Sequence, residues 1–353
     1  MVSDLSLNLV EKRWYVLVVC ISHRNGKFLD QLLANGVQVE ECSIKKNFFA
    51  FRFAQLLRQH NVEIVHSHVA FSMPWQVLGS RMAGITNIIF TQQNEYQNWS
   101  NHLGRRIRYK IYFLLFFRFI TAYTCVSFSV RKSLSRLTGK GESDFMVIPN
   151  AVDLNAFAPD ESLRRRQRVA LNISDNTKLV GMVARLAPQK GHEALLEAFA
   201  ELIKKVPQAK LILIGSGDLE ASLRAKSTSL GIKDNVIFYG NTLAINSMLN
   251  AMDVFILSSW WEGFGICLIE AMAVGLPIVT TRVAGVCNFI PAGEIFRVVD
   301  PGDVKAMSEQ LFSLLEKPVE REDRIRQIKS AEDNFRMENI VAQYLTLYNN
   351  KGK

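Results

Sequence analysis

The chain has 353 residues and a mass of 40.0 kDa, which is more than one hydrophobic core usually holds and predicts two domains of roughly 150 to 180 residues. Apolar residues make up 48% and charged residues 21% of the sequence, which excludes collagen-like, low-complexity and largely disordered proteins. The five cysteines lie far apart and lack metal-ligand spacing, so we expect reduced thiols in a cytoplasmic protein.

The net charge of +9 comes from the first half of the chain. Residues 1–150 contain 18 Lys and Arg against nine Asp and Glu, whereas 151–353 contain 24 of each. The longest apolar run within the basic stretch of the first half, 111–117, has seven residues and is far shorter than the roughly 20 that a spanning helix needs. We therefore expect no membrane span and, from the polar N-terminus, no secretory signal.

Short β-branched runs alternate with helical patterns, which predicts an α/β protein with parallel sheets. The first half has predicted strands at 14–21, 37–42, 64–68, 87–91, 122–126 and 145–148. The second half has predicted strands at 178–184, 210–214, 235–239, 254–257 and 278–281. We predict doubly wound domains at 1–157 and 158–335, and a C-terminal helix at 336–353 that returns toward the first domain. Such a pair implies a cleft at the carboxyl ends of the strands.

The segment 258–279 is the most informative. It is predicted to pass from a strand through the turn Gly263-Phe264-Gly265 into a helix. The backbone N–H groups at such a helix start bind anions, so we expect a phosphate there. Glu262 and Glu270 lie on either side of this position, with Glu270 about 7 to 8 Å along the helix axis. Their carboxylates could accept hydrogen bonds from two sugars joined by a diphosphate.

Cations are expected opposite that phosphate. Arg185 and Lys190 follow the strand 178–184 and are suited to a diphosphate, although each alone could be a solvated loop cation. Gly215 and Gly217 follow the next strand without the third glycine of a dinucleotide motif, so we interpret them as a close-approach turn beneath a nucleotide. The end of the following strand could contact a base edge through Tyr239 and Gly240.

In combination these motifs resemble a known family. They are R-L-x-x-x-K-G from Arg185, G-x-G-x-L from Gly215, E-G-F-G with a second Glu in an E-x7-E pattern from Glu262, and IPNAVDLNAF over 148–157. They are similar to the retaining nucleotide-sugar glycosyltransferases of family 4 (glycosyl transferases group 1), which have the GT-B fold of two Rossmann-like domains facing across a cleft. The resemblance is strongest over 148–285.

The resemblance implies specific roles. Arg185 and Lys190 would bind the donor diphosphate, Glu262 the transferred sugar, Phe264 and Gly265 the phosphates, and Glu270 the ribose. The enzyme would move a sugar to a glycan or lipid-linked acceptor in polysaccharide or glycolipid biosynthesis, with retention and without metal or cofactor. A non-catalytic nucleotide-sugar-binding or scaffold subunit remains the alternative, whereas the incomplete glycine motif disfavours a nicotinamide-dependent dehydrogenase.

The first half departs from the family pattern. The chain starts in what resembles the helix after the first strand, so that strand and its Gly-Gly loop are expected to be missing. Gln93 stands where many members have a histidine, and it cannot act as a base. The acceptor-side candidates are His66, His68, Gln93, Glu95 and Asp153. Both histidines could instead be structural, and Asp153 could be a turn former.

The basic stretch Arg105–Lys140 contains nine cations interleaved with aromatic residues. A buried crossover helix from residue 111 is one interpretation. The other is a surface for anionic lipid heads, which suits a cytoplasmic enzyme peripheral to the inner membrane face and acting on a lipid-linked acceptor. No nucleic-acid-binding signature accompanies the charge.

Overall fold

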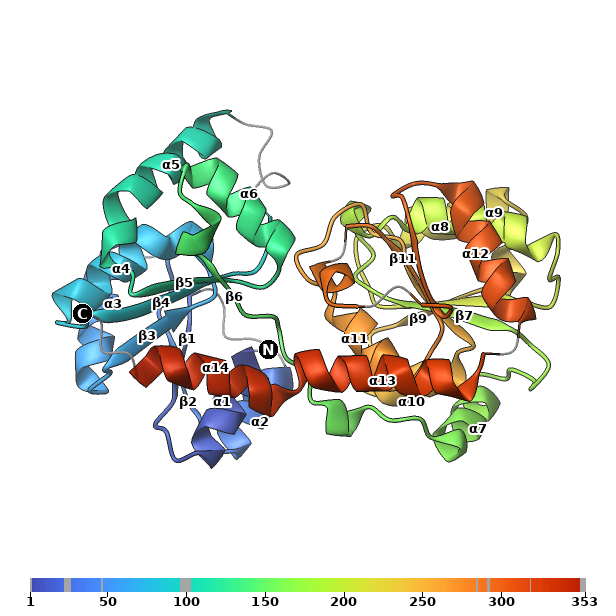
Figure 1. The fold of residues 1–353 in the computed structure, drawn as a ribbon, viewed down its shortest axis with the longest axis horizontal. Helices are drawn as coiled ribbons and strands as arrows, with labels where there is room; N and C mark the ends of the chain where they lie inside the picture. The colour runs from blue at the N-terminus through green and yellow to red at the C-terminus, as the bar shows by residue number, and fades with distance from the viewer. Residues whose placement is uncertain are drawn as a thin grey trace. The chain divides into compact units, whose positions relative to one another are not determined.

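The computed structural model describes residues 2–21, 27–45, 47–95, 103–283, 285–290, 293–317 and 319–349. The chain forms two compact units, which we call the first unit (Met1–Ala151 with Met337–Lys353) and the second unit (Val152–Arg336). The chain passes between them after residue 151, where the sequence predicted 157. Each unit is an α/β structure with parallel strands (Figure 1), which confirms the predicted fold class.

The strands of the first unit form two sheets. β1 (Leu17–Cys20) pairs with β2 (Gln38–Glu41). The second sheet has the order β3 (Ile64–Ser67), β4 (Asn87–Gln92), β5 (Ala122–Cys125) and β6 (Met146–Val147). All six predicted strands are present, and within the described residues no strand pairing joins β1 to β3.

The C-terminal helix supplies part of the core of the first unit. The helices of this unit are α1 (Val2–Glu11), α2 (Lys27–Ala34), α3 (Phe49–Gln59), α4 (Met73–Met82), α5 (Leu103–Phe116), α6 (Phe128–Thr138) and α14 (Met337–Asn349). The buried residues of α14 recur every three or four positions, so they form one apolar face. Val341 and Tyr344 on this face pack with Leu5 and Leu9 of α1 and Ile89 of β4, and Figure 1 shows α14 running beside α1. The first unit is therefore complete only with the end of the chain.

The second unit contains one six-stranded sheet. Its order is β12 (Phe296–Val299), β11 (Ile278–Thr281), β10 (Val254–Leu257), β7 (Leu179–Val183), β8 (Lys210–Ile214) and β9 (Val236–Gly240). The chain first builds outward from β7 to β9 and then crosses back to β10, so the order reverses between β7 and β10. Ligands of doubly wound sheets bind at this switch point, outside the carboxyl ends of the strands.

Seven helices among the described residues of the second unit connect or flank the strands: α7 (Glu161–Ala170), α8 (His192–Ile203), α9 (Glu220–Ser229), α10 (Ile245–Ala251), α11 (Ile266–Ala273), α12 (Val304–Glu316) and α13 (Arg321–Phe335). All five predicted strands are present, and β12 is an additional one. β12 escaped prediction because it is a short edge strand whose apolar run is interrupted by Arg297.

Candidate functional site

The predicted donor residues meet at the switch point of the second unit. Lys190 lies in the loop after β7 and Glu262 in the turn after β10, and the Lys190 ammonium forms an ion pair with Glu262 Oε1. Ser259 Oγ donates to the same oxygen at 2.8 Å. Glu262 is only 8% exposed, so this carboxylate is held by a cation and a hydroxyl rather than by water.

Hydrogen bonds lock the two loops together. The backbone N–H of Trp260 donates to the Gln189 carbonyl at 2.8 Å, and the Gln189 amide donates to the Trp261 carbonyl at 2.9 Å. Ser258 Oγ donates to the Lys190 carbonyl at 3.0 Å. Ser258 and Ser259 were not among the predicted site residues. Two serines directly after a buried strand could have indicated polar contacts at the carboxyl edge of the sheet.

Gly191 shows how closely the loops approach. Its φ is +66°, and a Cβ built on it would lie 2.1 Å from the carbonyl oxygen of Ser258. Only glycine fits this conformation and this space. The position of Lys190 beside Glu262 therefore depends on the residue that follows it.

The turn Gly263-Phe264-Gly265 leads into α11 as predicted. Gly265 is the N-cap with φ +93° and provides no side-chain cap. The Leu268 N–H donates to the Gly265 carbonyl at 3.0 Å, so the helix amides that an anion could meet are those before Leu268. Phe264 is buried against Phe289 and Phe335, with ring centroids 6.3 and 5.7 Å away. This packing fixes the turn that carries the backbone amides.

Glu270 lies half-buried on α11. The pKa of the Cys267 thiol is raised mainly by burial. The negative charges of Glu262 and Glu270 raise it further. The two glutamates therefore share one environment at the start of the helix, with Lys190 as the neighbouring cation. Lys190 also acts on His192, whose pKa is lowered to about 4 by burial and by that ammonium.

The loops after β8 and β9 complete this edge of the sheet. A Cβ at Gly215 would lie 2.1 Å from the Ala184 carbonyl oxygen, and one at Gly217 would lie 2.3 Å from the Leu186 carbonyl oxygen. The Gly215 N–H donates to the Gly240 carbonyl at 2.8 Å. The glycine pair is thus a close-approach turn. The neighbouring side chains of Arg185 and Tyr239 are exposed.

Three of the acceptor-side candidates also come together, at the carboxyl edge of the four-stranded sheet in the first unit. His66 bonds Tyr348 through Nδ1 and Thr91 through Nε2, each at 2.7 Å, so it fits the structural interpretation. His68 Nδ1 lies 3.1 Å from Gln93 Nε2. The sequence analysis missed Asn150, which donates to Gln93 Oε1 at 3.1 Å, although it lies in the quoted IPNAVDLNAF string.

The two acidic candidates do not join this cluster. Glu95 is half-buried, and no hydrogen bond links it to the cluster within the described residues. Asp153 belongs to the second unit, where its exposed carboxylate accepts from the Asn155 N–H at 3.1 Å and caps a short helical turn. Its geometry fits a turn former.

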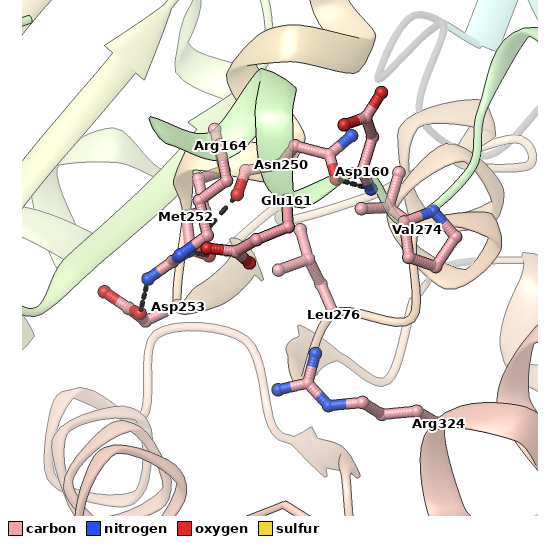
Figure 2. A pocket seen from close by; sticks show the side chains of 10 residues that line it. Asp160, Glu161, Arg164, Asn250, Met252, Asp253, Val274, Leu276 and Arg324 are labelled. Carbon is pink, nitrogen blue, oxygen red and sulfur yellow. Dashed lines mark hydrogen bonds and ion pairs between the residues drawn. The ribbon is translucent and has the colours of Figure 1, made fainter. Parts of the chain in front are cut away.

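A separate cavity of about 530 Å³ lies at the amino-terminal edge of the sheet in the second unit (Figure 2). Arg164 reaches Asp253 at 2.6 Å beside it, and Asp253 accepts from the N–H of Leu179, the first residue of β7. Arg168, which is 1% exposed, bonds the carbonyl oxygen of Ala251 at 2.8 Å. Both arginines hold α7 against the amino-terminal edge of the sheet, which lies opposite the switch point. Because the cavity lies at this edge, it is not the predicted donor site.

Neither a candidate membrane span nor a candidate metal cluster occurs among the described residues. No helix there combines the length and hydropathy that crossing a membrane requires. No cluster of three or more His, Cys, Asp or Glu side chains there is placed to hold a metal ion.

Two family models and several known proteins are similar to this chain. The model described as "Glycosyl transferases group 1" matches residues 164–332, and "Glycosyltransferase Family 4" matches residues 1–156. One relative is N-acetyl-alpha-D-glucosaminyl L-malate synthase from Bacillus anthracis, 27% identical over 85% of this chain and 77% of the relative. Another is a GDP-mannose-dependent monoacylated alpha-(1-6)-phosphatidylinositol monomannoside mannosyltransferase from Corynebacterium glutamicum, 28% identical over 77% and 72%.

Solved structures extend the likeness in fold. HepE from Anabaena, in complex with UDP and glucose, matches with a TM-score of 0.85 at 20% identity, over 99% of this chain and 95% of that one. WaaG, a glycosyltransferase involved in lipopolysaccharide biosynthesis, matches with a TM-score of 0.73 at 17% identity, over 98% and 94%. The chain therefore belongs to the glycosyltransferases of group 1 and family 4, and its two Rossmann-like units are those of the GT-B fold.

Proposed function

We propose that the chain is a retaining glycosyltransferase that moves a sugar from a nucleoside-diphosphate donor to a glycan or lipid-linked acceptor in polysaccharide or glycolipid biosynthesis. The observation that carries this proposal is the Lys190–Glu262 ion pair at the start of α11, on the switch point of the sheet. A cation, uncapped helix amides and a carboxylate at one position suit a sugar diphosphate.

In the proposed reaction the bond between the sugar anomeric carbon and the diphosphate oxygen breaks. The acceptor hydroxyl forms its new bond on the same face, and its proton passes to the leaving diphosphate. Lys190, Arg185 and the amides of Phe264 and Gly265 stabilise the departing negative charge. Glu262 holds a sugar hydroxyl and Glu270 the ribose. Because these groups supply the positive charge, we propose that transfer needs no metal or cofactor, and activity should survive EDTA.

Donor binding is tested by thermal shift with UDP-, GDP- and ADP-sugars. A donor at 100 times its dissociation constant should stabilise the protein by roughly 2.7 kcal/mol. Lys190→Ala should abolish the shift, whereas Lys204→Ala should keep it, because Lys204 is an exposed lysine paired with Glu201 on α8. If no donor stabilises the wild type, the proposal fails. Donor binding without transfer to extracted lipids or glycans would favour the non-catalytic alternative.

We further propose that α5 binds an anionic membrane surface, as in a peripheral enzyme at the cytoplasmic face. Tyr109 and Phe113 are buried, whereas Ile107 and Leu114 are 49% and 81% exposed. Exposed Arg108 and Lys110 lie on the same helix as these apolar side chains. Apolar side chains beside cations suit anionic headgroups.

Vesicle sedimentation tests the membrane proposal. Vesicles containing phosphatidylglycerol should retain the protein, and salt or Leu114→Glu should release it, whereas pure phosphatidylcholine vesicles should not bind. Val169→Glu is the matched control, because Val169 is 79% exposed on α7 of the second unit. Equal binding of both variants would contradict the proposal.

A further inference from the structure

The cavity at the amino-terminal edge of the second unit has the size of a small-molecule site. Its volume of about 530 Å³ lies within the range of roughly 300 to 1,000 Å³ that is usual for ligand pockets. Its walls come from the segment 159–161 that leads into α7, from the residues before β10, from the turn after α11 and from α13. The cavity therefore has room for a ligand at the edge opposite the predicted donor site.

Two charged side chains of the cavity wall, Arg164 and Asp253, already have partners. Arg164 Nη2 lies 2.6 Å from Asp253 Oδ1, and Arg164 Nη1 donates to the Met252 carbonyl at 2.7 Å. Asp253 Oδ2 accepts from the Leu179 N–H at 2.7 Å and lies 3.4 Å from Nη1 of the buried Arg168. Both carboxylate oxygens of Asp253 are therefore occupied by groups other than a ligand.

The two remaining acids of the cavity wall belong to the start of α7. Asp160 is the N-cap of this helix, and its carboxylate accepts from the backbone N–H groups of Ser162 and Leu163 at 2.8 and 3.0 Å. Glu161 forms an ion pair with Arg165 at 3.5 Å. Capping bonds of this kind stabilise the first turn of a helix, so these carboxylates also have partners within the protein.

Arg324 is the charged side chain of the cavity wall that has no ion pair within the described residues. It extends from α13 toward the other wall residues (Figure 2), and its guanidinium donates to the Gly275 carbonyl at 3.3 Å. A guanidinium has five N–H donors, so most of them remain for another acceptor. Partial burial and then the nearby Arg164 charge lower the pKa of Arg324, whereas the Asp253 charge raises it. Positive charge therefore exceeds negative charge beside Arg324.

Apolar side chains line the cavity beside this cation. Met252, Val274 and Leu276 all contribute to its wall, and the protein buries each of them almost completely. They hold this part of the wall in place and leave it without polar side-chain atoms. An apolar wall with one charged group is typical of pockets that bind small organic molecules, because the charged group fixes the orientation of the ligand.

We propose that this cavity binds a small organic anion, with its carboxylate or phosphate on Arg324 and its apolar body against Met252 and Leu276. A guanidinium can donate two parallel hydrogen bonds to either head group. Lys190 and Glu262 lie at the opposite edge of the same sheet, so this ligand is distinct from the sugar donor. The bound anion connects the segment before α7 with α13.

Anion binding is tested with benzoate and phenyl phosphate, each titrated into the full chain and followed by the Arg324 Nε–Hε and Leu276 backbone amide resonances. At least one of the two should shift both resonances with saturation, and the tighter one identifies the preferred head group. Benzyl alcohol has the same ring without the charge and should give no saturable shift. No saturable shift with either anion, or equal binding of benzyl alcohol, would overturn the proposal.

Two arginines of α13 provide the variant and its matched control. Arg324→Ala should weaken the binding seen at Leu276 about tenfold or more, because it removes the charged hydrogen bonds to the head group. Arg326→Ala should leave it unchanged, because Arg326 is an exposed arginine of the same helix that pairs with Asp323. Arg324→Gln also removes the charge and replaces Arg324→Ala if that variant does not fold. Equal binding by wild type and both Arg324 variants would overturn the proposal.

A repeat of the titration with UDP present separates the cavity from the donor site. Saturating UDP should leave the shifts at Arg324 and Leu276 in place, because the two sites lie at opposite edges of the sheet. Loss of the anion shifts with UDP would place the anion in the donor site and overturn the proposal. If the wild type fails to bind UDP, the proposed donor function fails while the cavity keeps its own result.

Discussion

The two units carry different side chains at the same edge of a parallel sheet. In the second unit this edge carries the Lys190–Glu262 ion pair and the amides that begin α11. In the first unit it carries uncharged side chains: Asn150, Gln93 and His68 are joined by hydrogen bonds, and the His66 ring packs against that of His68. Ions suit a diphosphate, whereas neutral side chains supply no charge to neutralise one. The two edges therefore differ in the charge that they offer to a ligand.

The largest effect should follow from removing the Lys190 cation of the second unit. Lys190→Ala should lower kcat about 100- to 1,000-fold, as loss of one positioned donor commonly does. It also leaves the buried Glu262 carboxylate unpaired, at a cost of about 3 to 5 kcal/mol in folding free energy. The double variant with Glu262→Gln should regain much of that stability but not the activity. A transfer rate within twofold of wild type for Lys190→Ala would show that the Lys190 cation does not contribute to transfer.

The second effect concerns the backbone that holds that cation. Gly191→Ala and Gly231→Ala both place alanine at positive φ, +66° and +72°. Gly231 has open space around its missing Cβ, whereas Gly191 faces the Ser258 oxygen at 2.1 Å. We expect about 1 to 2 kcal/mol of destabilisation at Gly231 and distinctly more at Gly191, measured by urea unfolding. Equal losses would show that the two loops are not in tight contact.

The third effect is a pH dependence that follows the neutral histidines. Burial lowers the pKa values of His66, His68 and His192 below 6.5, so the unfolded chain binds protons that the folded chain does not. The unfolding free energy should be fully developed above about pH 7. It should fall as the pH drops from 6.5 toward 4, by about 1.4 kcal/mol per pH unit for each histidine.

Urea titrations across this pH range measure the slope of the unfolding free energy against pH. His68→Gln should reduce this slope by the equivalent of about one proton, because it removes one histidine with a lowered pKa. A slope unchanged by His68→Gln would show that the pKa of His68 is not lowered in the folded chain.

The smallest effect is expected at Asp153. Asp153→Ala removes an exposed cap in the second unit and should cost about 0.5 to 1 kcal/mol, with transfer to any acceptor unchanged. Thermal unfolding and a transfer assay measure both quantities. If Asp153→Ala remains folded but transfers sugar distinctly more slowly than wild type, Asp153 returns to the acceptor-side residues.

The sequence predicted eleven strands and the donor turn because these depend on local pattern. Buried runs such as Val254–Leu257 and the glycines beside α11 are visible in the residue order. The Asn150–Gln93 bond was out of reach because it joins side chains 57 positions apart. The return of the C-terminal helix to the first domain was predicted, but its packing against α1 was not, because that contact joins distant parts of the sequence.

The proposed function depends on diphosphate binding at the start of α11 in the second unit. The most direct measurement is a UDP titration followed by the backbone amide resonances of the deuterated protein. The largest saturable shifts should occur at Gly265 and Ile266, and Lys190→Ala should weaken them. Largest shifts at Gln93 and Asn150 in the first unit, with Gly265 unmoved, would contradict it.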